Sequence, residues 1–169
     1  MSQAARADND NLHVDIRSGD VILPGELVLP AEAQAVVLFA HGSGSSKHSP
    51  HTQLVARAIR DAGVGTLLFD LLTKEEETID ARTAHLRFDI GMLAQRLVDA
   101  TEWVENEFAE MRIGYFGSST GGGAALVAAA DKREDVDAVV SRGGRPDLAG
   151  DALPRVKAAT LLIVGGLDY

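Results

Sequence analysis

The sequence contains no cysteine, so it offers no disulfide framework, no thiolate metal site and no cysteine nucleophile. Basic residues are also scarce, because 16 lysines and arginines stand against 25 aspartates and glutamates, a formal net charge of −9. A nucleic-acid partner would favour a basic face, so none is expected. No apolar run reaches the roughly 20 residues of a membrane helix, and the polar start lacks the pattern of a secretory signal. We therefore expect a cytoplasmic protein with no membrane partner and a mobile tail at residues 1–11.

Residues 12–169 are expected to form a single domain, in which short apolar runs alternate with segments of helical period. The runs 12–17 and 21–29 predict an antiparallel hairpin. Five nearly all-apolar runs then predict strands buried on both faces, as in a parallel sheet. These five runs are 35–40, 65–72, 112–116, 137–141 and 160–166. The alternation predicts a doubly wound, mostly parallel α/β sheet, in which chemistry gathers at the carboxyl ends of the strands.

Helices are predicted between these strands. The first has Ser49 as N-cap, Pro50 at its first position and Gly63 after its end. Its predicted apolar stripe consists of Leu54, Val55, Ala58, Ile59 and Ala62. The longest helix is predicted at about residues 85–108, and a third at 124–130. The charged run KEEE, residues 74–77, is expected to be a solvated loop.

The stretch GSSTGGG, residues 117–123, joins a predicted strand to a predicted helix. Its first five residues fit the pattern G-x-S-x-G, in which a sharp strand-to-helix turn exposes the central serine. The strained backbone at that serine requires neighbours, here Gly117 and Gly121, that are nearly free of side-chain atoms. We therefore expect Ser119 to be a nucleophile. The alternative is a tight turn with an idle serine.

A second glycine-rich loop, HGSGSS at residues 41–46, directly follows the predicted strand 35–40. Backbone N–H groups in this position can stabilise a developing oxyanion, together with the N–H of the residue after the nucleophile. We expect this oxyanion hole to consist of Gly42, Ser43, Gly44 and Thr120. The alternative is a phosphate-binding turn, although no G-K-[ST] pattern supports it.

Asp168 follows the last predicted strand, where a carboxylate can orient a catalytic histidine, although aspartate is also a common turn residue. In this architecture the histidine comes after the acid. All five histidines of the chain precede Ser119: His13, His41, His48, His51 and His85. We therefore expect a partial chain that stops before the general base, the last strand and the closing helix. The histidines nearest the loop, His41, His48 and His51, are interpreted as structural.

Two further stretches of the sequence bear on partners and on substrate binding. The absent last strand would leave an apolar edge at residues 160–166, through which a homo-oligomer could form. The stretch SRGGRPDLA, residues 141–149, follows a predicted strand and places Arg142 and Arg145 near the mouth of the site. These guanidinium groups either hold an anionic end of the substrate or form a structural clamp with Asp147.

The segments HGSGSSKHSPHTQLVARAI, FDLLTKEEE, GYFGSSTGGGAAL, SRGGRPDLA and LLIVGGLD together resemble the dienelactone-hydrolase-like branch of the α/β-hydrolase superfamily. The resemblance spans nearly the whole chain after the tail. It implies an α/β-hydrolase sheet, a nucleophile at Ser119, an acid at Asp168, ester- or lactone-type substrates and no metal or other cofactor. Dienelactone hydrolases proper carry a cysteine nucleophile, so their named lactone is not carried over. The expected function is a serine hydrolase acting through an acyl-enzyme; the alternative is a catalytically silent hydrolase-fold module that binds a ligand or protein.

Overall fold

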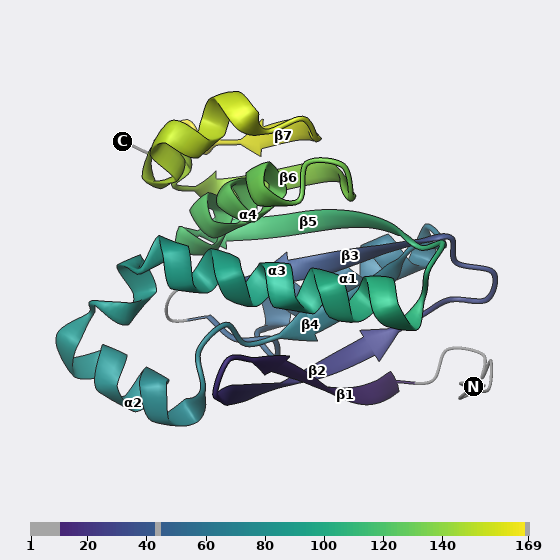
Figure 1. Ribbon diagram of the computed structural model, residues 1–169, viewed down its shortest axis with the longest axis horizontal. Coiled ribbons are helices and arrows are strands. Elements are labelled where there is room, and N and C mark those ends of the chain that lie inside the picture. Colours follow the sequence, from purple (N-terminus) through teal and green to yellow (C-terminus); the bar gives the residue numbers. More distant parts are fainter. Residues whose placement is uncertain (1–10, 43–44, 168–169) are drawn as a thin grey trace.

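The computed structural model describes residues 11–42 and 45–167, which form one seven-stranded sheet with helices on both faces (Figure 1). The spatial order of the strands is β1-β2-β4-β3-β5-β6-β7. The strands are β1 (Asn11–Ser18), β2 (Val21–Val28), β3 (Ala35–Ala40), β4 (Gly65–Phe69), β5 (Arg112–Ser119), β6 (Val136–Gly144) and β7 (Ala159–Ile163). The helical segments are α1 (Pro50–Asp61), α2 (Lys74–Thr83), η1 (Leu86–Phe88), α3 (Ile90–Glu107), α4 (Thr120–Asp131) and η2 (Pro146–Arg155).

The strand directions confirm the predicted mostly parallel sheet with an N-terminal hairpin. β1 and β2 are antiparallel to each other, β2 is antiparallel to β4, and every pair from β4 to β7 is parallel. The hairpin begins one residue earlier than predicted, because Asn11 already pairs with Val28. The remainder of the predicted tail, residues 1–10, lies outside the described residues.

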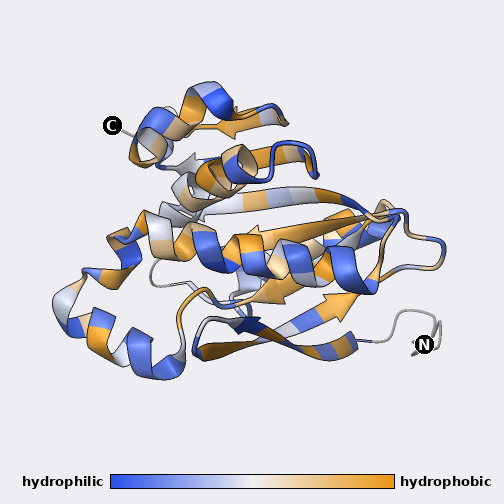
Figure 2. Ribbon diagram, viewed as in Figure 1, coloured by the Kyte–Doolittle hydropathy of each residue, from blue (hydrophilic) through white to orange (hydrophobic). Residues whose placement is uncertain are grey.

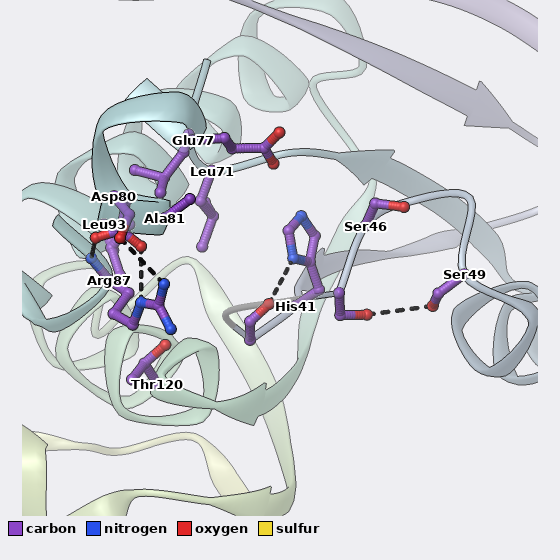
Figure 3. A pocket seen from close by; sticks show the side chains of 13 residues that line it. His41, Ser46, Ser49, Leu71, Glu77, Asp80, Ala81, Arg87, Leu93 and Thr120 are labelled. Atoms are coloured by element: carbon purple, nitrogen blue, oxygen red, sulfur yellow. Dashed lines mark hydrogen bonds and ion pairs between the residues drawn. The ribbon is translucent and has the colours of Figure 1, made fainter. Parts of the chain in front are cut away.

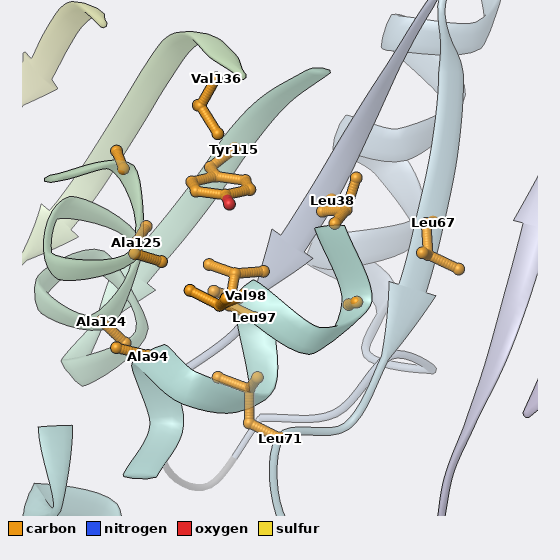
Figure 4. Close-up of a cluster of buried hydrophobic side chains, with 14 of the residues drawn as sticks. Leu38, Leu67, Leu71, Ala94, Leu97, Val98, Tyr115, Ala124, Ala125 and Val136 are labelled. Atoms are coloured by element: carbon orange, nitrogen blue, oxygen red, sulfur yellow. The ribbon is translucent and has the colours of Figure 1, made fainter. Parts of the chain in front are cut away.

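Alternation along the central strands divides the core between the two faces of the sheet. Leu38 of β3 belongs to the large cluster under α3 and α4, shown with Tyr115 and Leu97 in Figure 4. Its neighbour Phe39 belongs to a smaller cluster with Ala56 of α1. Because successive side chains of a strand point to opposite faces, both faces of the central strands must be apolar. Figure 2 accordingly shows hydrophobic strands and helices that carry polar residues as well.

The start of α1 was predicted correctly, but its buried face was not. The Ser49 side chain accepts a hydrogen bond from the Thr52 N–H, as an N-cap residue does. The buried residues of the helix are Thr52 and Ala56, whereas Leu54 is 64% exposed. Only small side chains fit where α1 lies closest to the sheet. The larger apolar residues therefore lie to the side of this contact or in solvent.

The connection between β4 and β5 differs from the prediction in two places. The run KEEE is the first turn of α2 and not a loop. Thr73 and Glu76 form a capping box, in which each side chain accepts a hydrogen bond from the other residue's backbone N–H. The longest helix, α3, begins at Ile90 instead of residue 85, because the Asp89 side chain caps it by accepting the Met92 N–H.

A largely buried arginine of α3 binds the first turn of α2. The Arg96 guanidinium donates from both terminal nitrogens to the Glu76 carboxylate, at 2.6 and 2.7 Å, and also to the Leu71 carbonyl oxygen at 2.6 Å. The Arg96 side chain is only 7% exposed, so the pair is shielded from water. This contact joins α2 to the helix layer that packs on the sheet.

We expect Arg96→Met to lower the free energy of unfolding by about 2–4 kcal/mol, because it leaves a partly buried carboxylate without its partner. Arg96, then the Thr73 N–H, outweigh burial and lower the pKa of Glu76. The pair therefore stabilises the fold above the unfolded-state pKa of glutamate, and this contribution is lost as the pH falls through the lowered pKa. Urea unfolding at pH 7 and pH 4 measures both effects. Arg57→Met, an exposed change on α1, is the control, and an equal effect of the two variants would contradict the prediction.

The last strand is the least covered part of the sheet. β7 pairs with β6 and stands at the end of the strand order. Its residues Leu161, Leu162 and Ile163 are 55%, 49% and 45% exposed. The expectation that a second copy of the chain pairs with this edge stays a prediction. No helix in residues 11–42 and 45–167 has the length and apolar character needed to cross a bilayer.

Candidate active site

The turn between β5 and α4 holds Ser119 in a strained conformation. Ser119 ends β5 and has φ 51° and ψ −129°, a region that residues with a side chain rarely adopt. Its carbonyl oxygen is held by the backbone N–H of Arg145 at 3.0 Å. Strain of this kind costs about 1–3 kcal/mol and persists where the surroundings impose it, most often at functional sites.

The surrounding glycines permit this turn by steric necessity. A Cβ added to Gly117 would lie 2.7 Å from the Cα of Gly122, and one added to Gly121 would lie 2.0 Å from the carbonyl oxygen of Ala40. Gly123 also lies close to a neighbouring segment, because a Cβ added to it would lie 2.8 Å from the Arg145 carbonyl oxygen. The predicted reason for Gly117 and Gly121, a sharp turn that leaves no room for side-chain atoms, agrees with this geometry.

Two cavities meet at the loop after β3. The larger, of about 410 Å³, lies beneath α2 and is partly apolar, with Leu71, Ala81 and Leu93 among its lining residues (Figure 3). The smaller, of about 270 Å³, is lined in part by Ser119 and Arg142. Both cavities share His41, Gly42 and Ser45. Ser119 therefore lies beside a divided cleft at the carboxyl ends of β3 and β5.

The described part of the predicted oxyanion hole lies next to Ser119. A Cβ added to Gly42 would lie 2.5 Å from the Ser119 Cβ and 3.3 Å from its Oγ, so only glycine fits there. In this conformation the Gly42 N–H donates to the Ser118 Oγ at 3.2 Å. Thr120 begins α4, where the first N–H groups have no partner within the helix, and it lines the larger cavity. Ser43, Gly44 and Asp168 lie outside the described residues, so their predicted roles stay predictions.

The structure separates the two arginines that the sequence grouped together. Arg142 lines the smaller cavity with Ser119. Arg145 instead forms a bidentate pair with Asp147, at 2.9 Å from Nε and 2.6 Å from Nη2, and lines neither cavity among the described residues. For Arg145 this is the clamp that the sequence left open as an alternative to substrate binding.

Both ring nitrogens of His41 lie close to polar partners, but only Nδ1 makes a hydrogen bond. Its Nε2 lies 2.8 Å from the Asp70 Oδ1, and its Nδ1 lies 3.0 Å from the Gly42 carbonyl oxygen. Burial lowers the pKa of His41, but the Asp70 carboxylate and the Gly42 carbonyl outweigh burial and raise it above its usual value. Both nitrogens are thus directed at partners other than Ser119, which agrees with the structural role predicted for His41.

The other four histidines lie in different parts of the fold, and His51 lines the smaller cavity. His51 in α1 lines the smaller cavity, and His48 precedes that helix with its Nδ1 4.0 Å from the Glu26 carboxylate. His13 is in β1, and His85 precedes η1. Neither His13 nor His85 is among the described residues that line these two cavities.

Sequence reasoning missed two acidic residues near His41. Asp70 follows β4 directly, and the only signal for it was an acidic residue at the carboxyl end of a buried strand. Glu77 of α2 lines the larger cavity; burial, with a smaller effect of Asp70, raises its pKa. Its position became evident only when KEEE proved to be helical.

Comparison with known proteins agrees with this fold. Residues 23–169 match the model of the dienelactone hydrolase family. The crystal structure of a dienelactone hydrolase from Anabaena variabilis is 60% identical and superimposes with a TM-score of 0.90, covering 95% of this chain and 75% of that chain. Two Mycobacterium tuberculosis proteins, provisionally named phosphoribosyl transferases, are each 55% identical over 157 residues. The match covers 92% of this chain and 34% of theirs, so the chain spans about a third of these relatives. By sequence and by structure, the chain belongs to the dienelactone hydrolase family and has its α/β-hydrolase fold.

Proposed function

We propose that this chain provides the nucleophile of a serine hydrolase that cleaves small carboxylic esters or lactones through an acyl-enzyme at Ser119. The observation that carries the proposal is the strained Ser119, with φ 51°, at the wall of a cleft. Such a turn at the carboxyl end of a central parallel strand is the location that this fold uses for a nucleophile. Membership of a hydrolase family supports the same reaction class.

In the proposed reaction the Ser119 Oγ attacks the substrate carbonyl, and its proton passes to a general base. The negative charge that develops on the carbonyl oxygen is stabilised by the N–H of Thr120 and by N–H groups of the loop 42–44. The N terminus of α4 favours the same charge, because the helix dipole is positive there. We propose that the base is a histidine outside this chain, oriented by Asp168.

The catalytically silent module is the rival hypothesis, and the conformation of Ser119 disfavours it. A module that only binds a ligand has no need of a strained serine beside a cleft, and about 1–3 kcal/mol of stability would be lost without benefit. The name phosphoribosyl transferase belongs to relatives that are about three times as long. We propose that any such activity resides in the parts of those proteins that this chain does not match.

The direct test is to trap the nucleophile. Full-length protein containing this chain is incubated with a fluorophosphonate probe, and peptide mass spectrometry then locates the adduct. We expect a single adduct on Ser119. Folded protein that forms no adduct would favour the silent module.

Arg142 is the proposed contact for a negatively charged substrate group, because it lines the cavity that contains Ser119. We expect Arg142→Ala to raise KM about tenfold for an ester with a free carboxylate, since a charge-assisted hydrogen bond contributes about 1.5–3 kcal/mol, and to leave KM of the neutral ester nearly unchanged. Arg145→Ala is the matched control, because Arg145 is paired with Asp147. Equal KM changes for both esters would refute the role of Arg142.

A further inference from the structure

Asp70 contacts His41, which lines both cavities, and the proposed reaction has no use for this carboxylate. β3 and β4 pair in parallel with Phe39 opposite Leu68, so the residues that follow the two strands, His41 and Asp70, come side by side. The His41 side chain is 10% exposed and that of Asp70 is 26% exposed. The two therefore meet at the carboxyl edge of the sheet, largely out of water, and His41 shares the smaller cavity with Ser119.

A single oxygen of Asp70 holds both ends of the loop 41–47. Its Oδ1 lies 2.8 Å from the His41 Nε2 at the start of the loop, and it accepts the backbone N–H of Lys47 at 2.9 Å at the end. The Lys47 carbonyl oxygen is held in turn by the Gln53 side chain of α1 at 2.7 Å. Both ends of this loop are consequently anchored to the body of the sheet.

The contacts of His41 favour its protonated form. The Gly42 carbonyl oxygen can only accept, so the His41 Nδ1 that faces it carries a proton. The Nε2 lies 2.8 Å from the Asp70 Oδ1, an ion-pair distance, although the two atoms lack the alignment of a hydrogen bond. Burial opposes the charge, but a carboxylate at this distance stabilises the imidazolium and raises the pKa of His41 above its usual value.

The loop anchored in this way contacts Ser119. His41 Nδ1 and the Ser45 N–H both point at the Gly42 carbonyl oxygen, at 3.0 and 3.2 Å. The close approach of Gly42 to the Ser119 side chain leaves no room for a displacement toward it. A shift of Gly42 would therefore change its contact with the Ser119 side chain.

We propose that Asp70 is a positioning residue, which holds Gly42 against Ser119 through its contacts with the His41 ring and the Lys47 N–H. This inference rests on the proposed function, because the loop matters for catalysis only if Ser119 reacts. Asp70 itself touches no reacting atom. It acts through His41 and through the backbone.

The pH dependence follows from the charges around His41. Asp70 faces it from the end of β4 and Glu77 from α2; the Asp80–Arg87 pair lines the larger cavity, while His51 and Arg142 line the smaller one. The Lys47 ammonium donates to the Pro24 carbonyl oxygen. Because the folded-state pKa of His41 is raised, the contact is fully present below the unfolded-state pKa and is lost as the pH rises through the raised value.

The test compares Asp70→Asn with the unchanged full-length protein. The asparagine oxygen can still accept the Lys47 N–H but carries no charge for His41. We expect nitrogen NMR of the His41 ring to show two ring protons at pH 6 in the unchanged protein, and a lower His41 pKa in the variant. We also expect amide hydrogen exchange at Gly42 to become at least about tenfold faster, and fluorophosphonate labelling of Ser119 to slow about 10- to 100-fold, because a shift near 1 Å costs about that much.

Controls separate this inference from the function on which it rests. Asp20→Asn in the turn between β1 and β2 should leave all three measurements unchanged, and His41→Gln should reproduce the exchange and labelling effects if Asp70→Asn does not fold. A single ring proton on His41 at pH 6, or unchanged loop exchange in Asp70→Asn, would overturn the positioning role. Labelling at the unchanged rate despite faster loop exchange would overturn it as well. If the NMR and exchange results are as expected but no protein labels, the anchoring of the loop stands and the hydrolase proposal fails.

Discussion

Ser119→Ala is expected to lower the rate of ester hydrolysis by full-length protein that contains this chain at least about 10⁴-fold. The loss is this large because nucleophile and base act as a unit. The side chain lost is small and sits at the wall of a cleft, so the fold should remain intact. Removing the hydroxyl also removes the acyl-enzyme itself, and the remaining rate would come only from substrate binding and oxyanion stabilisation. Steady-state kinetics with a p-nitrophenyl ester, together with a burst experiment on the unchanged protein, measure the effect.

Ser118→Ala is the matched control for this experiment. Ser118 is adjacent in sequence, lines the same cavity and accepts the Gly42 N–H through its Oγ. We expect a loss of less than about tenfold, because a single neutral hydrogen bond contributes about 0.5–1.5 kcal/mol. If Ser118→Ala abolished the adduct while Ser119→Ala kept it, the assignment of the nucleophile would be wrong.

Gly121→Ala is expected to cause the largest loss of stability, about 3–5 kcal/mol. The new methyl group would lie 2.0 Å from the carbonyl oxygen of Ala40 and 2.6 Å from its carbonyl carbon. Both atoms belong to the backbone of β3, in the middle of the sheet, and cannot rotate away as a side chain would. Relief requires α4 to move away from β3, which would also displace Ser119. Urea denaturation measures the free energy, and fluorophosphonate labelling measures the displacement.

Gly91→Ala provides the control for a glycine in a helix. A Cβ on Gly91 would meet only the Asp89 Oδ1, at 3.8 Å, and the residue is exposed in the first turn of α3. This change should stabilise the protein by up to about 1 kcal/mol, since alanine is the better helix former. If Gly121→Ala and Gly91→Ala had the same unfolding midpoint, the prediction would be wrong, because α4 would then move away from β3 without loss of stability.

Much of the fold follows from local sequence patterns. The apolar run 35–40 is a strand with the predicted bounds, because its side chains are buried on both faces and leave no helical alternative. Ser49 caps α1 as predicted, since capping depends on contacts within one turn. The elbow at Ser119 was also predicted, because its glycines are a local steric requirement.

The errors concern features that neighbours in space decide. KEEE was predicted to be a solvated loop, but Thr73 and Glu76 form a capping box, and the run is the first turn of α2. Leu54 was predicted to be buried, but the line of closest approach between α1 and the sheet selects Thr52 and Ala56 instead. The ends of a helix are local, whereas the face that it buries depends on its rotation against the sheet.

The sequence by itself determined the class of fold, the strand order along the chain and the turn at Ser119, because each depends on residues within a few positions of one another. Only the tertiary structure decided the partners that surround that turn. The register between β3 and β4 places Asp70 beside His41, 29 positions earlier in the chain. The same sheet directs Arg142 into the cleft and leaves Arg145 paired with Asp147. Such contacts arise from strand register and helix rotation, which the packing of the whole core sets and no short stretch of sequence records.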